Sequence, residues 1–132
     1  MEMKGRIIMK GNAQDIALVT SQTISFYGGV DPNTGIIIEK GHELQGKSVN
    51  GKILVFPTGK GSTVGSYTLY RMKKSGTAPS GIINKECGTV IAVGAIISEI
   101  PCVDLIDISK IQTGDLVSIE NEDVIILNVA ER

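Results

Sequence analysis

The segment from Phe56 to Arg71 contains the residue types of this chain that are best suited to chemistry. An apolar run ends at Phe56, a glycine-rich segment follows, and a helical pattern begins at Ser62. The first N–H groups of a helix lack internal partners and carry a partial positive charge, and glycine lets a ligand approach the backbone closely. We therefore predict a phosphate or carboxylate site at this point. Its candidate residues combine glycines, an ammonium group and hydroxyls: Gly59, Lys60, Gly61, Ser62, Thr63 and Ser66.

Spacing excludes two nucleotide-binding motifs. In the Walker pattern G-x-x-x-x-G-K-S/T the lysine follows the glycine, whereas Lys60 precedes Gly61. The Rossmann pattern G-x-G-x-x-G requires a third glycine where this chain has Val64. A plain glycine turn with Ser62 capping the helix remains the alternative. The anion site is favoured because Ser62 and Ser66 are spaced to face one side of a helix, and because a lysine between two glycines has no use in a core.

The hydrophobic pattern that must position this segment predicts a β-rich α/β domain. Valine and isoleucine dominate the apolar residues, and the 16 glycines favour tight turns between strands. One clear helix is expected over Ser62–Lys74, with Gly76 as its stop signal. Its buried face is expected to contain Val64, Leu69 and Met72. Strands or extended segments are expected over Lys4–Lys10, Ile16–Val19, Thr23–Tyr27, Ile53–Phe56, Gly81–Asn84 and Thr89–Ile97, from Ile100 to Val103, and over Leu116–Glu120 and Val124–Val129, the last two forming a hairpin.

The bulk composition fits a single domain over residues 1–132. An apolar fraction of 42% and a charged fraction of 20% are those of a globular protein. A net charge of -1 and an aromatic fraction of 4% argue against nucleic-acid binding. Because no apolar run could cross a bilayer and the start of the chain lacks a signal peptide, a cytoplasmic location is expected.

The cysteines and the single histidine do not form a recognisable metal motif. Cys87 and Cys102 lie far apart in the chain and are expected to be reduced, mostly buried thiols. A cluster site needs close cysteine pairs and further ligands. His42 is the only histidine and is expected to lie in a surface loop. We therefore expect no metal site within this chain.

Other charged residues have simple structural interpretations. Asp31 is expected to form an Asx-turn before a proline. Asp104 and Asp107 are expected at a solvated strand edge, and the basic run 71–74 at a solvated helix end.

The glycine-rich segment resembles the signature loop of a known family, the small subunits of the aconitase X group, which includes archaeal phosphomevalonate dehydratases. The stretch that carries the resemblance is Pro57-Thr58-Gly59-Lys60-Gly61-Ser62-Thr63-Val64-Gly65-Ser66. Further stretches resemble that family in the same order: Gly28–Gly35, His42 with Gly46, Gly76–Pro79, and Gly94-Ala95 with Ile100-Pro101. The resemblance therefore runs through most of the chain and is specific.

This resemblance implies a swivelling β/β/α domain of the aconitase type. It implies a larger partner subunit that holds a 4Fe-4S iron–sulfur cluster through its own cysteines, so that this chain alone binds no cofactor. The implied reaction of the two-chain hydro-lyase removes water from (R)-5-phosphomevalonate to give trans-anhydromevalonate 5-phosphate, a step of the archaeal mevalonate route to isoprenoids. The serine taken as the proton acceptor in that family falls on Ser62 here. The Gly28–Gly35 loop becomes a candidate wall of a shared active site.

One departure from citrate-cycle aconitases indicates a different substrate. Their loop serine is followed by another serine and an arginine, whereas Ser62 is followed by Thr63 and Val64. The arginine that clamps a carboxylate is absent there, and Arg71, near the end of the helix, is not expected to replace it. Two alternatives stay open: a non-catalytic module that binds an anionic metabolite, and a related dehydratase for another hydroxy acid, such as a hydroxyproline.

Overall fold

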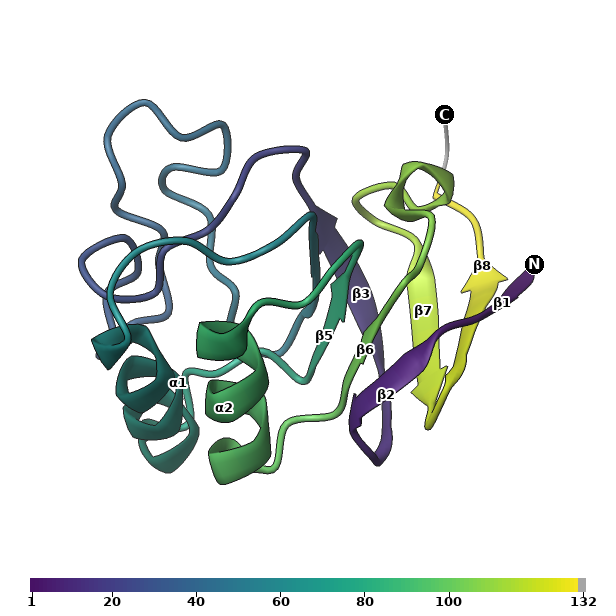
Figure 1. The fold of residues 1–132 in the computed structure, drawn as a ribbon. Coiled ribbons are helices and arrows are strands. Elements are labelled where there is room, and N and C mark those ends of the chain that lie inside the picture. The colour runs from purple at the N-terminus through teal and green to yellow at the C-terminus, as the bar shows by residue number, and fades with distance from the viewer. Residues whose placement is uncertain (131–132) are drawn as a thin grey trace.

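Two layers of β-strands and one layer of helices make up this computed structural model, which describes residues 1–130 (Figure 1). The described strands form one sheet in the order β1-β8-β7-β3-β4-β5-β6-β2. The layering confirms the predicted β-rich α/β class and the β/β/α arrangement. The strands are β1 (Glu2–Lys4), β2 (Arg6–Met9), β3 (Asn12–Val19), β4 (Ile53–Phe56), β5 (Gly81–Asn84), β6 (Cys102–Asp104), β7 (Leu116–Glu120) and β8 (Asp123–Asn128).

Strand β3 joins the two strand layers because its halves pair with different neighbours. Residues Asn12 to Ile16 pair antiparallel with β7, and Ala17 to Val19 pair parallel with β4. Strands β4, β5 and β6 continue the parallel pairing. The first predicted strand is in fact two, β1 and β2, which pair with β8 and β6 at opposite ends of the sheet order. Gly5 lies at the bend between them, where a Cβ would lie 2.2 Å from the Asp104 carbonyl oxygen.

Alternation along β4 shows how the layers pack. Leu54 and Phe56 belong to the core shared with the helices, whereas Ile53 and Val55 belong to the core between the strand layers. Such alternation is what a strand with apolar layers on both faces requires. Helices α1 (Val64–Ser75) and α2 (Thr89–Ser98) cover one side of the parallel strands (Figure 1). No helix within residues 1–130 combines the length and hydrophobicity needed to cross a membrane.

The prediction of a strand over Thr89–Ile97 is wrong, because this segment forms α2. Its β-branched residues favour a strand locally, but the connection from β5 to the parallel strand β6 requires a crossover, which a helix supplies. Gly94 is the residue in this segment that indicates close packing of a helix. A Cβ there would lie 2.7 Å from Leu69 Cδ1, so α1 and α2 pack closely only with glycine at this position.

The predicted helix starts later than expected. Its N-cap is Thr63, which makes no side-chain capping hydrogen bond, so Ser62 lies just outside the helix. Leu69 and Met72 are fully buried as predicted, whereas Val64 is 45% exposed because it lies at the open end of the first turn. Gly76 ends the helix with a φ of 76°, as predicted.

The remaining boundaries differ from the predictions by small amounts. The strand expected from Ile100 begins at Cys102, and the predicted C-terminal hairpin is confirmed as β7 and β8. Within residues 1–130, the segment Thr23–Tyr27 forms no regular strand and pairs through a single bridge from Ile24 to Gly59. A long irregular connection over residues 20–52 joins β3 to β4 and projects beyond one end of the parallel strands (Figure 1). Irregular connections of this length are commonly functional.

The side chains of His42 and Glu43 bind this connection to the residues that follow β3 through hydrogen bonds. His42 is buried, not surface-exposed as predicted, and its Nε2 lies 3.0 Å from the Thr23 carbonyl oxygen. Its Nδ1 accepts a hydrogen bond from the Leu44 N–H at 3.0 Å, which places the ring proton on Nε2. Glu43 accepts hydrogen bonds from the Thr20 hydroxyl and from the Ser21 N–H.

Glu43→Gln is expected to change how folding stability depends on pH. The hydrogen bond from Thr20 is the main reason that the pKa of Glu43 is lowered, and the bond from the Ser21 N–H adds to it. A carboxyl whose pKa is lowered by folding stabilises the protein above its unfolded pKa of about 4.3, and that contribution disappears as pH falls through the folded pKa. The unfolding free energy of the variant should therefore lie below that of the original chain at pH 7 and converge with it in acid.

Urea unfolding between pH 7 and pH 3 measures this difference. Thr20→Val removes the hydrogen bond that lowers the pKa of Glu43 most. It should therefore change the dependence of the unfolding free energy on pH over the same pH range. Parallel curves for both variants over the whole range would show that Glu43 contributes nothing through its charge.

Candidate active site

The carboxyl ends of the parallel strands bring the candidate residues to one edge of the protein. The loop of residues 57–63 leaves β4 there and leads into α1, and residues 85–88 leave β5 and lead into α2. The two loops touch, since the N–H groups of Lys85 and Glu86 both donate to the Pro57 carbonyl at 3.1 Å. In open α/β sheets this edge is where ligands bind.

The loop after β4 lies against the segment that follows β3. The Lys60 N–H donates to the Ile24 carbonyl at 3.0 Å, which continues the bridge between Ile24 and Gly59. Gly61 then turns the chain with a φ of 90°, and a Cβ there would lie 2.5 Å from the Ser25 Oγ. Only glycine suits both the backbone angle and the space.

Ser62 is exposed at the end of this turn. Its Oγ accepts a hydrogen bond from the Val64 N–H at 3.1 Å, so the hydroxyl lies over the start of α1. Within residues 1–130, the N–H groups of Gly61, Ser62 and Thr63 have no hydrogen-bond partner. Consecutive unpaired N–H groups beside a glycine in the left-handed region form a concavity that attracts anions.

Lys60 adds a positive charge to the same loop. Its ammonium pairs with Glu39 at 3.0 Å, and the side chains of Lys60 and Glu39 are 46% and 30% exposed. Sequence reasoning missed both Glu39 and Ser25 as neighbours of this loop. No local pattern could have found them, because they come from the irregular connection before β4.

Ser66 does not share the environment of Ser62. It is only 4% exposed, and its hydroxyl donates to the Val90 carbonyl at 2.7 Å. The structure therefore brings together five of the six predicted residues at the loop and places Ser66 between α1 and α2.

A buried carboxylate supports the neighbouring loop after β5. Asp104 is fully buried, which corrects the prediction of a solvated position, whereas Asp107 is exposed as expected. Arg6 donates to both carboxylate oxygens of Asp104, at 3.0 and 2.8 Å, and the Cys87 N–H donates to one of them at 2.8 Å. These bonds fix the residues just before α2.

The cysteines are free thiols in contact with one another. Cys102 is fully buried and Cys87 is partly buried. The hydrogen bond from the Cys102 thiol lowers the pKa of Cys87, and the same contact, together with burial, raises the pKa of Cys102. Among residues 1–130, no group of three or more His, Cys, Asp or Glu side chains could hold a metal ion. Since iron–sulfur clusters are held by several thiolates, the described part of this chain does not fit one.

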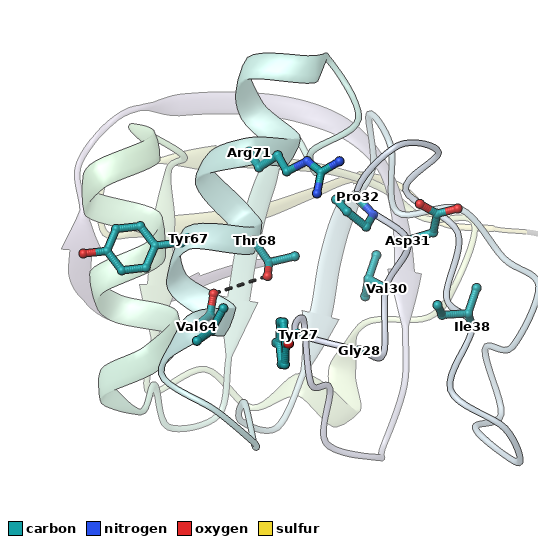
Figure 2. A pocket seen from close by; sticks show the side chains of 10 residues that line it. All are labelled: Tyr27, Gly28, Val30, Asp31, Pro32, Ile38, Val64, Tyr67, Thr68 and Arg71. Carbon is teal, nitrogen blue, oxygen red and sulfur yellow. Dashed lines mark hydrogen bonds between the residues drawn. The ribbon is translucent and has the colours of Figure 1, made fainter.

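A groove of about 330 Å³ runs beside the loop, between α1 and the Gly28–Gly35 segment (Figure 2). Arg71 projects over it toward Pro32 (Figure 2), and its Nη2 donates to the Asn33 Oδ1 at 3.0 Å. Asp31 forms the predicted Asx-turn, with its carboxylate accepting from the Asn33 N–H at 2.9 Å. Arg71 lies about two helical turns from the start of α1, which separates it from Ser62. The groove is lined by Tyr27, Gly28, Val30, Asp31, Pro32, Ile38, Val64, Tyr67, Thr68 and Arg71.

Gly59→Ala is expected to displace the loop and destabilise the protein by about 1–3 kcal/mol, the usual cost of overpacking. A Cβ at this position would lie 2.4 Å from Cγ1 and 2.8 Å from Cδ1 of Ile91, and that side chain is buried in the core and cannot move away. Urea unfolding measures the loss.

Gly88→Ala is the matched control at the same edge. The nearest atom to a Cβ there is the Thr58 Oγ1 at 3.6 Å, and its φ of -83° suits alanine. Combining Gly59→Ala with Ile91→Ala should cost less than the sum of the single changes, because the second removes the clashing atoms. Additive losses would show that the loop does not depend on this contact.

Comparison with known proteins agrees with this geometry. The family model for the aconitase X swivel domain matches residues 2–127. The chain is 51% identical over 126 residues to the phosphomevalonate dehydratase small subunit of Methanosarcina acetivorans, covering 93% of this chain and 88% of that protein. It is 52% identical over 120 residues to the protein of the same name from Thermococcus sibiricus, covering 91% and 92%.

A solved structure extends the likeness to three dimensions. A chain in the crystal structure of holo-form aconitase X from Thermococcus kodakaraensis superposes with a TM-score of 0.95 at 48% sequence identity, covering 97% of this chain and 99% of that one. Because the family model matches nearly the whole length of this chain, the chain belongs to the aconitase X swivel-domain family.

Proposed function

We propose that this chain is the small subunit of a two-chain hydro-lyase that dehydrates (R)-5-phosphomevalonate to trans-anhydromevalonate 5-phosphate in the mevalonate route to isoprenoids. One observation carries the proposal: relatives named phosphomevalonate dehydratase small subunit are about half identical to this chain over nearly their whole length. The proposal places the enzyme in the cytoplasm.

In this proposal Ser62 accepts the proton that leaves the carbon beside the substrate carboxylate, while the hydroxyl leaves the neighbouring carbon. An isolated serine is a weak base, so its alkoxide needs stabilisation. The Val64 N–H on its oxygen and the positive end of α1 supply it.

The other loop residues are proposed to hold the substrate. Gly61 offers an unpaired N–H, Thr63 offers a hydroxyl, and Lys60 offers a charge. Gly59 lets the loop lie close to Ile91. Ser66, whose hydroxyl is already bonded to Val90, is proposed to position α1 against α2 and not to contact the substrate.

The 4Fe-4S cluster belongs, in this proposal, to the large subunit. A thiolate-held cluster needs several cysteines, and this chain has two, of which Cys102 is fully buried. The active site is then formed where the partner covers the loop after β4.

Co-expression with a cluster-bearing large subunit, followed by anaerobic purification and an assay with (R)-5-phosphomevalonate, tests the proposal. We expect a stable complex with the absorbance of an iron–sulfur protein and turnover to the dehydrated product. Each subunit alone should be inactive. If the complex does not act on this substrate but dehydrates a hydroxyproline, the chain is a subunit of one of the related dehydratases. A chain that binds anions without any partner would indicate a binding module.

A further inference from the structure

A second cavity, of about 390 Å³, lies beside the active-site loop and is lined almost entirely by polar residues. Three parts of the chain meet there: the segment after β3, the start of the 39–50 loop and the loop after β4. Lys60 is the residue that this cavity shares with the loop of Ser62. The lining residues are Gln22, Thr23, Glu39, Lys40, Gly41, His42 and Lys60.

The charges around this cavity suit a dianion. It contains two ammonium groups, on Lys40 and Lys60, and one carboxylate, on Glu39. Glu39 pairs with Lys60, whereas Lys40 forms no ion pair within residues 1–130. The side chains that line the cavity therefore carry a net positive charge, and the one further carboxylate nearby, on Glu43, is turned to Thr20 and Ser21. A phosphate monoester brings a charge of about -1.5 to -2.

The backbone next to Lys40 is held by its neighbours, while the Lys40 side chain is exposed. Gly41 turns the chain with a φ of 80°, and its N–H donates to the Gln45 side chain at 3.1 Å. The buried ring of His42 then holds the backbone against the Thr23 carbonyl, and Glu43 holds it against residues 20–21. The part of the cavity lining formed by residues 40–42 therefore rests on a backbone that is held by hydrogen bonds.

We propose that the cavity between Lys40 and Lys60 binds the phosphate group of the substrate. This inference rests on the proposed function, and the spacing fits it. Lys60 and Ser62 are two residues apart, which places their Cα atoms at most about 7 Å from each other. In the substrate, about five bonds of roughly 1.5 Å separate the carbon that loses its proton from the phosphorus atom. The separation of the Lys60 and Ser62 backbones is thus comparable to the separation of the phosphate from the reacting carbon of the substrate.

The groove beside α1 is a poorer phosphate site. Among the residues that line it, the one cation, Arg71, is matched by the carboxylate of Asp31, so the groove lacks the excess positive charge of the polar cavity. Its other lining side chains are mainly apolar, including Val30, Ile38 and Val64. The polar cavity at Lys40 therefore offers the better recognition of a phosphate.

Lys40→Met tests the phosphate site, with Lys47→Met as the matched control. Lys47 is exposed in the same loop but does not line the cavity. In the assembled enzyme, Lys40→Met should raise KM for (R)-5-phosphomevalonate roughly five- to tenfold with little change in kcat, as the loss of one charge contact made equally in the ground and transition states predicts. The control should leave KM unchanged. Equal KM values for both variants would overturn the proposal.

A binding experiment separates this proposal from the proposed function. In the isolated full-length chain, inorganic phosphate should shift the NMR signals of the Lys40, Gly41 and Lys60 amides in a saturable way. The apparent Kd should rise in Lys40→Met and remain unchanged in Lys47→Met. If the assembled enzyme does not turn over phosphomevalonate but this titration succeeds, the proposed reaction fails and the anion site stands. If turnover occurs and the titration shows no site at Lys40, the proposed phosphate site is wrong and the proposed reaction stands.

Discussion

Replacing Ser62 by alanine is expected to lower kcat of the assembled enzyme by roughly 10²–10⁴-fold, the usual contribution of a positioned acid–base group. The variant lacks the oxygen that accepts the Val64 N–H at the start of α1, and no other loop hydroxyl shares that contact. KM should change little, because the backbone N–H groups of residues 61–63 and the ammonium of Lys60 remain. Steady-state kinetics of the anaerobic complex measures both constants.

Ser75→Ala is the control for this experiment. Like Ser62, Ser75 is an exposed serine, but it lies at the C-terminal end of α1, away from the loop. Ser75→Ala should change the free energy of unfolding by less than about 0.5 kcal/mol, because the position is exposed. Ser62→Ala should cost about 0.5–2 kcal/mol, the usual effect of losing a hydrogen bond that caps a helix. Both variants should still fold and assemble. If Ser62→Ala keeps nearly normal turnover while forming the complex, Ser62 is not the proton acceptor, and the loop is left with a binding role.

The loop itself could be predicted from the sequence because its structure is local. A buried strand, glycines at 59 and 61 and a helical pattern after them lie next to one another in the chain, and the structure confirms their order. The surroundings of the loop could not be predicted in this way. Ser25, Glu39 and Lys40 come from the irregular connection over residues 20–52, which carries no periodic pattern. Their contacts depend on how the whole domain folds.

The errors in the fold have a similar physical origin. The segment that forms α2 contains strand-favouring residues, and its helical state is set by the crossover between β5 and β6. The polar residues His42 and Asp104 looked like surface residues. Both are buried because they have specific partners: the Thr23 carbonyl for His42, and Arg6 with the Cys87 N–H for Asp104. Burial of a polar group depends on partners distant in sequence, so composition alone does not reveal it.

Phe56→Ala is expected to reduce the free energy of unfolding by about 3–5 kcal/mol, the range for removing a large aromatic side chain from a core. Phe56 is fully buried at the end of β4, directly before the loop of residues 57–63. Its ring packs against Phe26 with centroids 6.3 Å apart and an interplanar angle of 60°, a favoured tilted geometry. Because Phe26 lies in the segment that pairs with Gly59, this contact also supports the loop.

Tyr67→Ala is the matched control, since Tyr67 is an aromatic residue of α1 that is 70% exposed. Its removal should change the unfolding free energy of the isolated chain by less than about 0.5 kcal/mol. A double-mutant cycle of Phe26→Ala and Phe56→Ala then isolates the ring contact, and the coupling should be about 0.5–1.5 kcal/mol. A loss below about 1 kcal/mol for Phe56→Ala would mean that the strand end is not rigidly packed. The loop would then be held by its backbone bonds to Ile24 and not by packing of Phe56. The position of Ser62 would have to be set by contacts other than the Phe26–Phe56 pair.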